Sequence, residues 1–306
     1  MRLVFAGTPS AAVPTLHRLA RDHDIVAVVT RPDAPLGRKK VLTPSPVAQA
    51  AVELGIPVIR AARLDEEATQ RIAALRPELG VIVAYGGLVR EPLLSAPDAG
   101  WINLHFSLLP QWRGAAPVQR ALIAGDAQLG ASVFQLVAEL DAGAVFASRV
   151  VEVPAGATAD IALEALAVDG AELTAEVVAG IAAGTARAIP QRGEPTFAPK
   201  LTLPDGLLDW SLPVAQVYAR FRGVTPEPGA HTTIDGQRLK IIEAAPASDT
   251  EAIDPGAIVA TKTAVLIGTA TTPLAVTRVQ PAGKGAMNAT DWWRGQRGAE
   301  GVRAGS

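Results

Sequence analysis

Apolar residues follow two different patterns along this chain. Over roughly the first 190 residues, short apolar runs alternate with longer segments in which apolar residues recur every three or four positions. Short runs are typical of buried strands, and the longer spacing is typical of amphipathic helices. We expect strands at 2–5, 25–30, 57–59, 79–84, 130–137 and 145–151, and helices at 10–22, 46–54, 64–75, 116–123 and 160–183. This alternation predicts an α/β fold with a Rossmann-like, mostly parallel, doubly wound sheet.

The pattern changes after residue 189. Prolines and a glycine interrupt every possible element in residues 190–206, which predicts a linker. Beyond it we expect one short helix at 215–222 and five short strands at 231–234, 238–243, 256–260, 264–267 and 274–279. Short strands separated by turn residues predict a small OB-like β-barrel. We therefore expect two domains, 1–189 and 207–306, joined by the linker 190–206.

Composition and charge narrow the class of protein. A hydrophobic fraction of 49% with 19% charged residues is typical of a folded, soluble chain. The sequence has no cysteine, and its four histidines show no metal-binding spacing, so we expect no metal site. No apolar run reaches the roughly 20 residues that span a bilayer, and no signal-peptide pattern opens the chain, which favours the cytoplasm and no membrane contact. A net charge of −2 argues against a dedicated nucleic-acid binder.

The densest chemistry lies in residues 100–117, GWINLHFSLLPQWRGAAP. Asn103, His105 and Ser107 alternate with apolar residues, so on a strand their side chains share one face. Proline and glycine then force a loop, which places Asn103 and His105 near the carboxyl end of a strand. Open α/β sheets bind their ligands at that end. Taken alone, a histidine beside an asparagine is more often a hydrogen-bonded structural pair than a catalyst.

A longer match favours catalysis. The string HFSLLP, followed by WRGAAP and by Leu140-Asp141-Ala142-Gly143, resembles the signature of the 10-formyltetrahydrofolate-dependent formyltransferases. The resemblance implies that Asn103, His105 and Asp141 form a catalytic trio. It also implies that the formyl donor, 10-formyltetrahydrofolate, lies in the adjacent cleft. The family commonly has LDTGD at the third segment, so Ala142 and Ala144 depart from the pattern while Asp141 is retained.

Two segments would border the donor. Residues 84–88, AYGGL, resemble the family turn whose backbone borders the folate pterin, although the family usually has one glycine there. A Gly-Gly after a strand is equally a plain turn signal. The folate-binding residues that the resemblance implies are Tyr85, Gly86, Gly87, Leu88, Ser107, Leu108, Leu109 and Pro110.

Residues 31–46, RPDAPLGRKKVLTPSP, form a long predicted loop with four prolines and a basic cluster. Its composition alone fits a solvated surface loop equally well. Members of the family that act on initiator methionyl-tRNA have such a loop reaching the acceptor stem, which implies tRNA contacts by Arg38, Lys39 and Lys40. FAPKL at 197–201 and Asp209-Trp210 resemble the domain junction of these members, which implies that 207–306 is a tRNA-binding domain. Trp292 and Trp293 could stack on RNA or simply pack in a core.

The residue types suit formyl transfer. Attack of an amine on a formyl group creates an oxyanion, which the neutral amide of Asn103 can stabilise. His105 can donate a second hydrogen bond or shuttle a proton, and Asp141 would orient the imidazole and raise its pKa. Ser107 lacks the surroundings of a nucleophile.

We therefore expect a monomeric enzyme that formylates the methionine amino group on initiator tRNA. Two alternatives stay open. The acceptor could be a small amine, such as an amino-sugar nucleotide or glycinamide ribonucleotide, although the basic loop and the predicted barrel argue against it. The chain could also be a non-catalytic RNA-binding protein, which the intact trio disfavours.

Overall fold

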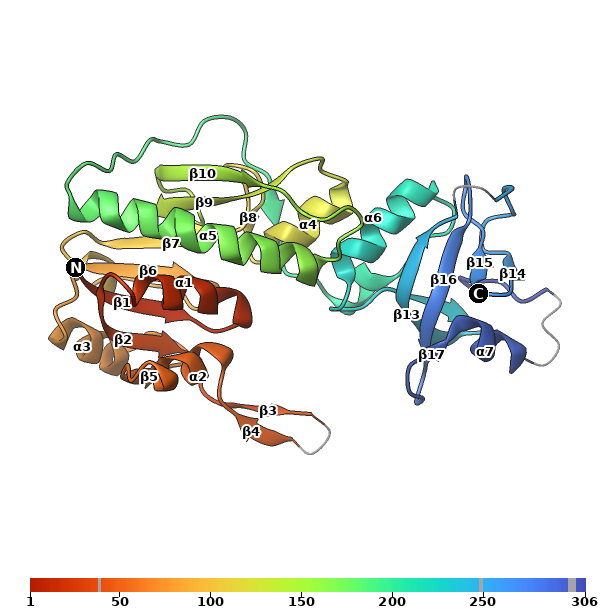
Figure 1. Cartoon of the computed structure of the whole chain (residues 1–306), viewed down its shortest axis with the longest axis horizontal. Coiled ribbons are helices and arrows are strands. Elements are labelled where there is room, and N and C mark those ends of the chain that lie inside the picture. Colours follow the sequence, from red (N-terminus) through yellow and green to blue (C-terminus); the bar gives the residue numbers. More distant parts are fainter. Residues whose placement is uncertain (38–39, 248–249, 297–300) are drawn as a thin grey trace. The chain divides into compact units, whose positions relative to one another are not determined.

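The computed structural model describes residues 1–37, 40–247, 250–296 and 301–306 (Figure 1). Its contacts divide the chain into two compact units. The first comprises Met1–Pro117, Gln128–Val153 and Leu163–Ala198; the second comprises Val118–Ala127, Pro154–Ala162 and Pro199–Ser306. Short pieces of the N-terminal half are therefore grouped with the C-terminal residues, and residues 190–198 of the predicted linker belong to the first unit.

The first unit is built on one sheet. Within the described chain its strands lie in the order β10-β9-β7-β6-β1-β2-β5. Pairing is parallel from β7 to β5 and antiparallel at β9 and β10, so the expected mostly parallel sheet is confirmed. The strand bounds are β1 Arg2–Gly7, β2 Asp24–Thr30, β5 Val58–Arg60, β6 Leu79–Val83, β7 Trp101–His105, β9 Leu129–Gln135 and β10 Val145–Val151.

Helices cover both faces of this sheet. On one face α1 packs on α2, and an ion pair of 2.9 Å between Arg18 Nε and Glu172 Oε2 joins α1 to α5. On the other face Ile72 of α3 and Leu93 of η2 share a buried cluster with Val4 and Trp101. The bounds are η1 Ser10–Ala12, α1 Val13–Leu19, α2 Pro46–Glu53, α3 Glu66–Ala74, η2 Leu93–Ser95 and α5 Ala159–Ala182. Helix α4 (Pro117–Ala124) is grouped with the second unit from Val118 onward.

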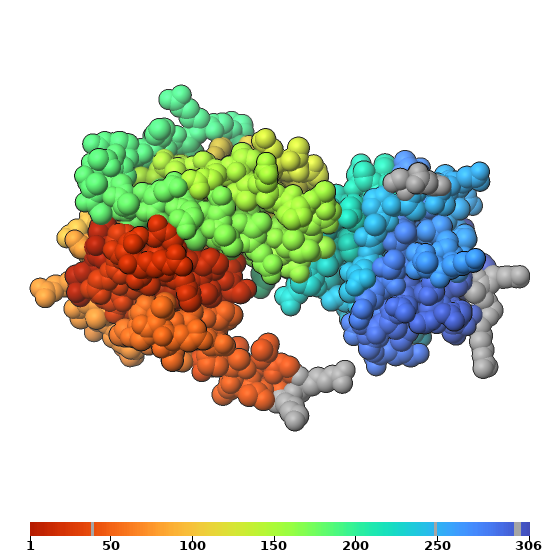
Figure 2. Space-filling view, viewed as in Figure 1, coloured from red at the N-terminus to blue at the C-terminus, as the bar shows by residue number. Residues whose placement is uncertain are grey.

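Two short strand pairs were not expected. The predicted loop 31–46 contains an antiparallel hairpin of β3 (Ala34–Leu36) and β4 (Val41–Thr43). Leu36 and Leu42 of this hairpin are 66% and 68% exposed, so no buried face could have marked it in the sequence. Figure 2 shows the hairpin protruding from the surface of the first unit. In the same unit, β11 (Phe197–Ala198) pairs in parallel with β8 (Arg113–Gly114).

The second unit contains a curled antiparallel sheet with strand order β12-β13-β16-β15-β14, and β17 pairs with β16. Its core includes Trp210, Phe221 and Trp292, so Trp292 is a packing residue. The five expected strands are confirmed, while β17 is additional. The bounds are η3 Leu203–Gly206, α6 Val214–Val224, β12 His231–Ile234, β13 Gln237–Pro246, β14 Ile258–Ala260, β15 Val265–Ile267, β16 Leu274–Pro281, β17 Met287–Asn288 and α7 Ala289–Arg294. None of the helices in the described ranges is both long and apolar enough to cross a bilayer.

Candidate active site

A cavity of about 800 Å³ opens at the carboxyl ends of β6 and β7 in the first unit. Its walls come from residues 84–91 after β6, residues 103–106 at the end of β7, and residues 136–141 after β9. The cavity adjoins the β1/β6 pair, where the chain reverses the direction in which it adds strands. Open α/β sheets bind ligands at such switch points, and the volume suits a small organic molecule.

Asn103 and His105 both line this cavity, as the alternation along β7 predicted. Leu104 between them packs against Gly170 of α5, where an added Cβ would lie 2.9 Å from a leucine methyl group. The half-buried amide of Asn103 makes no hydrogen bond to the chain as far as the structure describes it. The amide therefore keeps its N–H groups available for a ligand in the cavity.

The ring of His105 is buried and held from one side. Its Nε2 atom lies 2.8 Å from the backbone oxygen of Trp112. Because a carbonyl can only accept, Nε2 carries the proton of the neutral ring and Nδ1 keeps its lone pair. Nδ1 lies 3.8 Å from Oδ2 of Asp141, so the two groups interact through charge without a direct hydrogen bond.

Burial lowers the pKa of His105 below its usual 6.5, although the charge of Asp141 and the carbonyl of Trp112 both act to raise it. Asp141 does act to raise this pKa, as we expected. The loss of hydration on burial has the larger effect, however, so the net shift is downward. The imidazole is neutral near pH 7, and its free lone pair suits a proton acceptor.

Asp141 reaches the cavity from the turn after β9. Its backbone has a φ of 46°, a left-handed conformation that is costly for a side chain with a Cβ. Its Oδ2 atom accepts a hydrogen bond of 2.7 Å from the N–H of Gly114. Close packing explains the downstream glycine, because a Cβ on Gly143 would lie 1.7 Å from the oxygen of Gln135. The glycine of the LDAG string is thus a geometric requirement of this turn.

The expected folate-binding residues divide into two groups. Tyr85, Gly86, Gly87 and Leu88 line the cavity, whereas Ser107, Leu108, Leu109 and Pro110 are not part of the lining. The latter four form the turn beyond β7. Ser132 of β9 holds this turn, because its hydroxyl accepts from the N–H of Leu109 and donates to the oxygen of Ser107.

Sequence reasoning missed the backbone and linker groups that hold the trio. The Trp112 carbonyl orients His105, but a backbone oxygen leaves no residue-type signal. Gln191 binds the turn of Asp141, yet it lies in a segment that its prolines and glycine marked as a linker. A polar side chain within an irregular segment has no periodicity, so its contacts are visible only in the folded chain.

The basic cluster in residues 31–46 is only partly described. Arg38 and Lys39 lie outside the described residues. Lys40 is exposed in the turn between β3 and β4, and its N–H donates to the oxygen of Gly37. Across the described ranges, no group of three or more His, Cys, Asp or Glu side chains could hold a metal ion.

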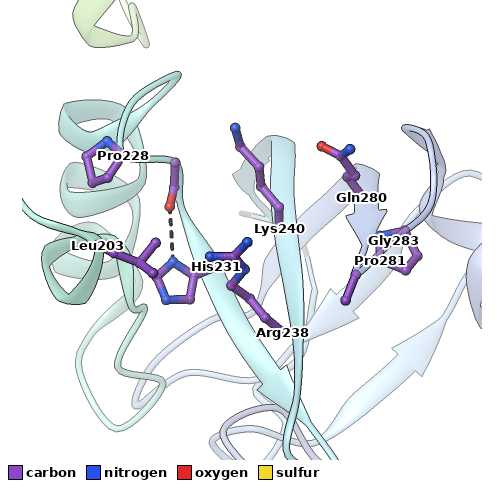
Figure 3. A pocket seen from close by; sticks show the side chains of 10 residues that line it. Leu203, Pro228, His231, Arg238, Lys240, Gln280, Pro281 and Gly283 are labelled. Atoms are coloured by element: carbon purple, nitrogen blue, oxygen red, sulfur yellow. Dashed lines mark hydrogen bonds between the residues drawn. The ribbon is translucent and has the colours of Figure 1, made fainter. Parts of the chain in front are cut away.

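A second, smaller cavity lies in the second unit. It has a volume of about 240 Å³ and is lined by Arg238 and Lys240 of β13 and Gln280 of β16, with the buried His231 beside them (Figure 3). The Nδ1 atom of His231 lies 3.1 Å from the oxygen of Gly229. No aspartate or glutamate is among the described lining residues. Two cations in a cavity whose described lining holds no carboxylate favour an anionic ligand.

Comparison with known proteins identifies the class. Residues 1–178 match the family described as formyl transferase, and residues 200–297 match the formyl transferase C-terminal domain. The chain belongs to the formyl transferase family. A methionyl-tRNA formyltransferase from Clavibacter sepedonicus is 62% identical over 298 residues, which cover 96% of this chain and 97% of that relative.

Solved structures share the fold at low identity. HypX from Aquifex aeolicus matches with a TM-score of 0.70 and 18% identity, covering 97% of this chain and 48% of HypX. An N-formyltransferase from Helicobacter canadensis, solved with folinic acid and dTDP-3-aminofucose, matches with a TM-score of 0.69 and 16% identity over 91% of this chain and 98% of that one. At these identities the two structures show that the fold is shared and nothing beyond the fold.

Proposed function

We propose that this protein transfers the formyl group of 10-formyltetrahydrofolate to the amino group of methionine on initiator methionyl-tRNA. The observation that carries the proposal is the meeting of Asn103, His105 and Asp141 at one cavity, in a chain whose 62% identity to a methionyl-tRNA formyltransferase extends over both domains. We further propose that the protein acts as a monomer in the cytoplasm.

In the proposed reaction, the methionine amine attacks the formyl carbon. A C–N bond forms to the methionine, and the C–N10 bond of the folate breaks. Asn103 donates an amide N–H to the formyl oxygen as negative charge develops there. Its side chain has no hydrogen-bond partner among the described residues, so the amide is available for this role. We assign the pterin to the wall formed by Tyr85, Gly86, Gly87 and Leu88. The turn from Ser107 to Pro110 supports the carboxyl end of β7 from behind.

His105 moves the proton that the reaction requires. Its Nδ1 lone pair accepts the proton lost by the attacking amine, and the ring then returns this proton to N10 of the leaving folate. The hydrogen bond from Nε2–H to the Trp112 oxygen keeps the ring in place while Nδ1 accepts and releases the proton. Asp141, at 3.8 Å, stabilises the transient imidazolium through its charge.

We assign tRNA contacts to two places. The first is the basic cluster of the segment 31–46, namely Arg38, Lys39 and Lys40. The second is the small cavity of the second unit, where Arg238 and Lys240 would bind a backbone phosphate. Both are local basic sites, which reconciles a nucleic-acid substrate with a net charge of −2.

The proposal is tested by supplying labelled formyl donor with three acceptors in turn: charged initiator tRNA, charged elongator tRNA, and small amines including an amino-sugar nucleotide. We expect formylation of charged initiator tRNA. Formylation of small amines alone would replace this proposal with the runner-up acceptor, and binding of tRNA without transfer would favour a non-catalytic RNA-binding protein.

The phosphate contact is tested with Arg238→Ala and Lys240→Ala, using Lys262→Ala as the control. Lys262 is exposed in the same unit but does not line the cavity. We expect each cavity variant to weaken tRNA binding and to reduce the slope of log K against log salt by about one. Equal effects from Lys262→Ala would show that only the overall charge matters.

A further inference from the structure

The strap, which we define as residues 191–198 after α5, runs beside the loops that carry the site. We propose that Gln191 of the strap is a positioning residue, which fixes the Asp141 turn against the Arg113 loop and so sets the distance from Asp141 to His105. This inference rests on the proposed function, because it concerns the reaction in which these residues act.

The amide nitrogen of Gln191 bonds to the turn itself. Nε2 donates to the backbone oxygen of Asp141 at 2.8 Å and to that of Gly143 at 2.9 Å. The two carbonyls belong to the turn in which Asp141 adopts its left-handed φ of 46°. A conformation of this kind persists only where its surroundings stabilise it, and the two N–H groups of Gln191 supply that support.

The amide oxygen of Gln191 bonds to the facing loop. Oε1 accepts from Nη2 of Arg113 at 2.8 Å and from Nε of Arg113 at 3.2 Å. The side chain of Arg113 is only 11% exposed. Both donors and the acceptor of this amide are therefore engaged. Glutamate would lack the N–H donors and asparagine would be one methylene too short, so the position requires glutamine.

The same strap holds the group that orients the imidazole. Thr196 Oγ1 accepts from the N–H of Trp112 at 2.9 Å, and the Thr196 carbonyl accepts from the N–H of Arg113 at 2.9 Å. The Trp112 carbonyl bonds to His105, and Trp112 has a φ of 60°. The two residues that interact with the His105 ring, Trp112 and Asp141, thus both have left-handed backbones. The strap makes a hydrogen bond to the backbone of each.

The kinetic test compares Gln191→Ala and Gln191→Glu with the control Gln70→Ala, which removes an exposed glutamine of α3. We expect Gln191→Ala to lower kcat for formyl transfer about 10- to 100-fold, because small misplacements of reacting groups are costly, while KM for the donor changes less than about twofold. Gln191→Glu keeps an acceptor for Arg113 but loses both N–H donors, so it should be impaired to a similar degree.

A double-mutant cycle separates positioning from general bracing. If Gln191 acts through Asp141, Gln191→Ala should cost less than about threefold in kcat when Asp141 is already asparagine. Losses that multiply in the double variant would overturn the inference, as would full activity of Gln191→Glu.

A readout without turnover keeps this inference distinct from the proposed function. The chain has four histidines, so their ring signals can be titrated separately by NMR, with His105→Gln identifying the signal of His105. We expect Gln191→Ala and Gln191→Asn to shift the titration of His105 to lower pH, because a displaced Asp141 no longer raises its pKa, and to leave His17, His23 and His231 unchanged. An unchanged His105 titration would overturn the inference. A wild-type protein that transfers no formyl group to any charged tRNA would instead refute the proposed function.

Discussion

Nδ1 of His105 lies 3.8 Å from Oδ2 of Asp141, and that same Oδ2 accepts a 2.7 Å hydrogen bond from the backbone N–H of Gly114. The carboxylate is thus fixed by the loop after β7 and acts on the imidazole through its charge. The ring owes its orientation to the Trp112 carbonyl on its other side. A negative charge fixed near a buried, neutral imidazole stabilises the protonated ring without holding its proton.

The decrease of activity on the acid side of the pH profile (the acid limb) should follow the protonation of His105. Because burial lowers its pKa below 6.5, we expect kcat/KM to fall only below that pH, as the ring becomes protonated and loses its acceptor. Asp141→Asn should move the limb to lower pH, since Asp141 raises this pKa. A limb centred above 6.5 in the wild-type protein would contradict the neutral ring.

The same pKa shift predicts how stability depends on pH. Below pH 6.5, His105 takes up a proton in the unfolded chain before it does so in the folded one, so the free energy of unfolding falls as pH falls. The slope from this residue is at most about 1.4 kcal/mol per pH unit. Urea unfolding measured near pH 7 and near pH 5 gives the loss of unfolding free energy between these two pH values. This loss should be smaller in His105→Gln than in the wild type. Equal losses would show that His105 protonates as readily in the folded protein.

Asn103→Ala should remove the donor to the formyl oxygen. We expect turnover to fall about 10²–10³-fold, the usual cost of losing one oxyanion donor, with folate binding nearly unchanged. Steady-state kinetics and a donor-binding titration separate the two effects. Donor binding that weakens in parallel with turnover would show that the amide binds the ground state.

His105→Ala and Asp141→Ala should be similarly severe in turnover and non-additive, because one group acts through the other. Steady-state kinetics of the two single variants and the double variant measure this coupling. A double variant whose kcat losses simply multiply would mean that the two groups act independently.

Gly143→Ala should disturb the Asp141 turn through space alone. Its added Cβ would meet the oxygen of Gln135, so we expect a loss of about 1–3 kcal/mol in unfolding free energy, together with reduced turnover. Gly285→Ala is the matched control, because a Cβ there meets nothing within 4 Å. Comparable stability of the two variants would mean that the turn relaxes without cost.

Arg38→Ala should separate tRNA binding from folate chemistry. We expect a lower kcat/KM for charged tRNA, an unchanged affinity for the formyl donor, and a salt dependence of tRNA binding reduced by about one unit of slope. Arg63→Ala, an exposed arginine outside the hairpin, provides the control. If both variants bind tRNA as the wild type does, the hairpin is a surface feature without a role in tRNA binding.

The sequence by itself determined the mostly parallel sheet, the five strands of the C-terminal unit and the placement of Asn103 and His105 on one strand. Each of these follows from local periodicity, since burial on one or both faces of a strand marks its residues directly. Asp141 could be assigned only from the resemblance of its segment to a family signature. The steric reason for Gly143 in that segment, its close approach to Gln135, is visible only in the folded chain.

Only the tertiary structure decided what holds these groups together. The Trp112 carbonyl, the N–H of Gly114 and the amide of Gln191 reach the site through contacts between segments distant in sequence, and none of them belongs to a periodic pattern. The net direction of the His105 pKa shift was likewise decided by burial, which depends on everything packed around the ring. The exposed β3–β4 hairpin escaped prediction for the opposite reason, because strands that bury neither face leave no alternation to read.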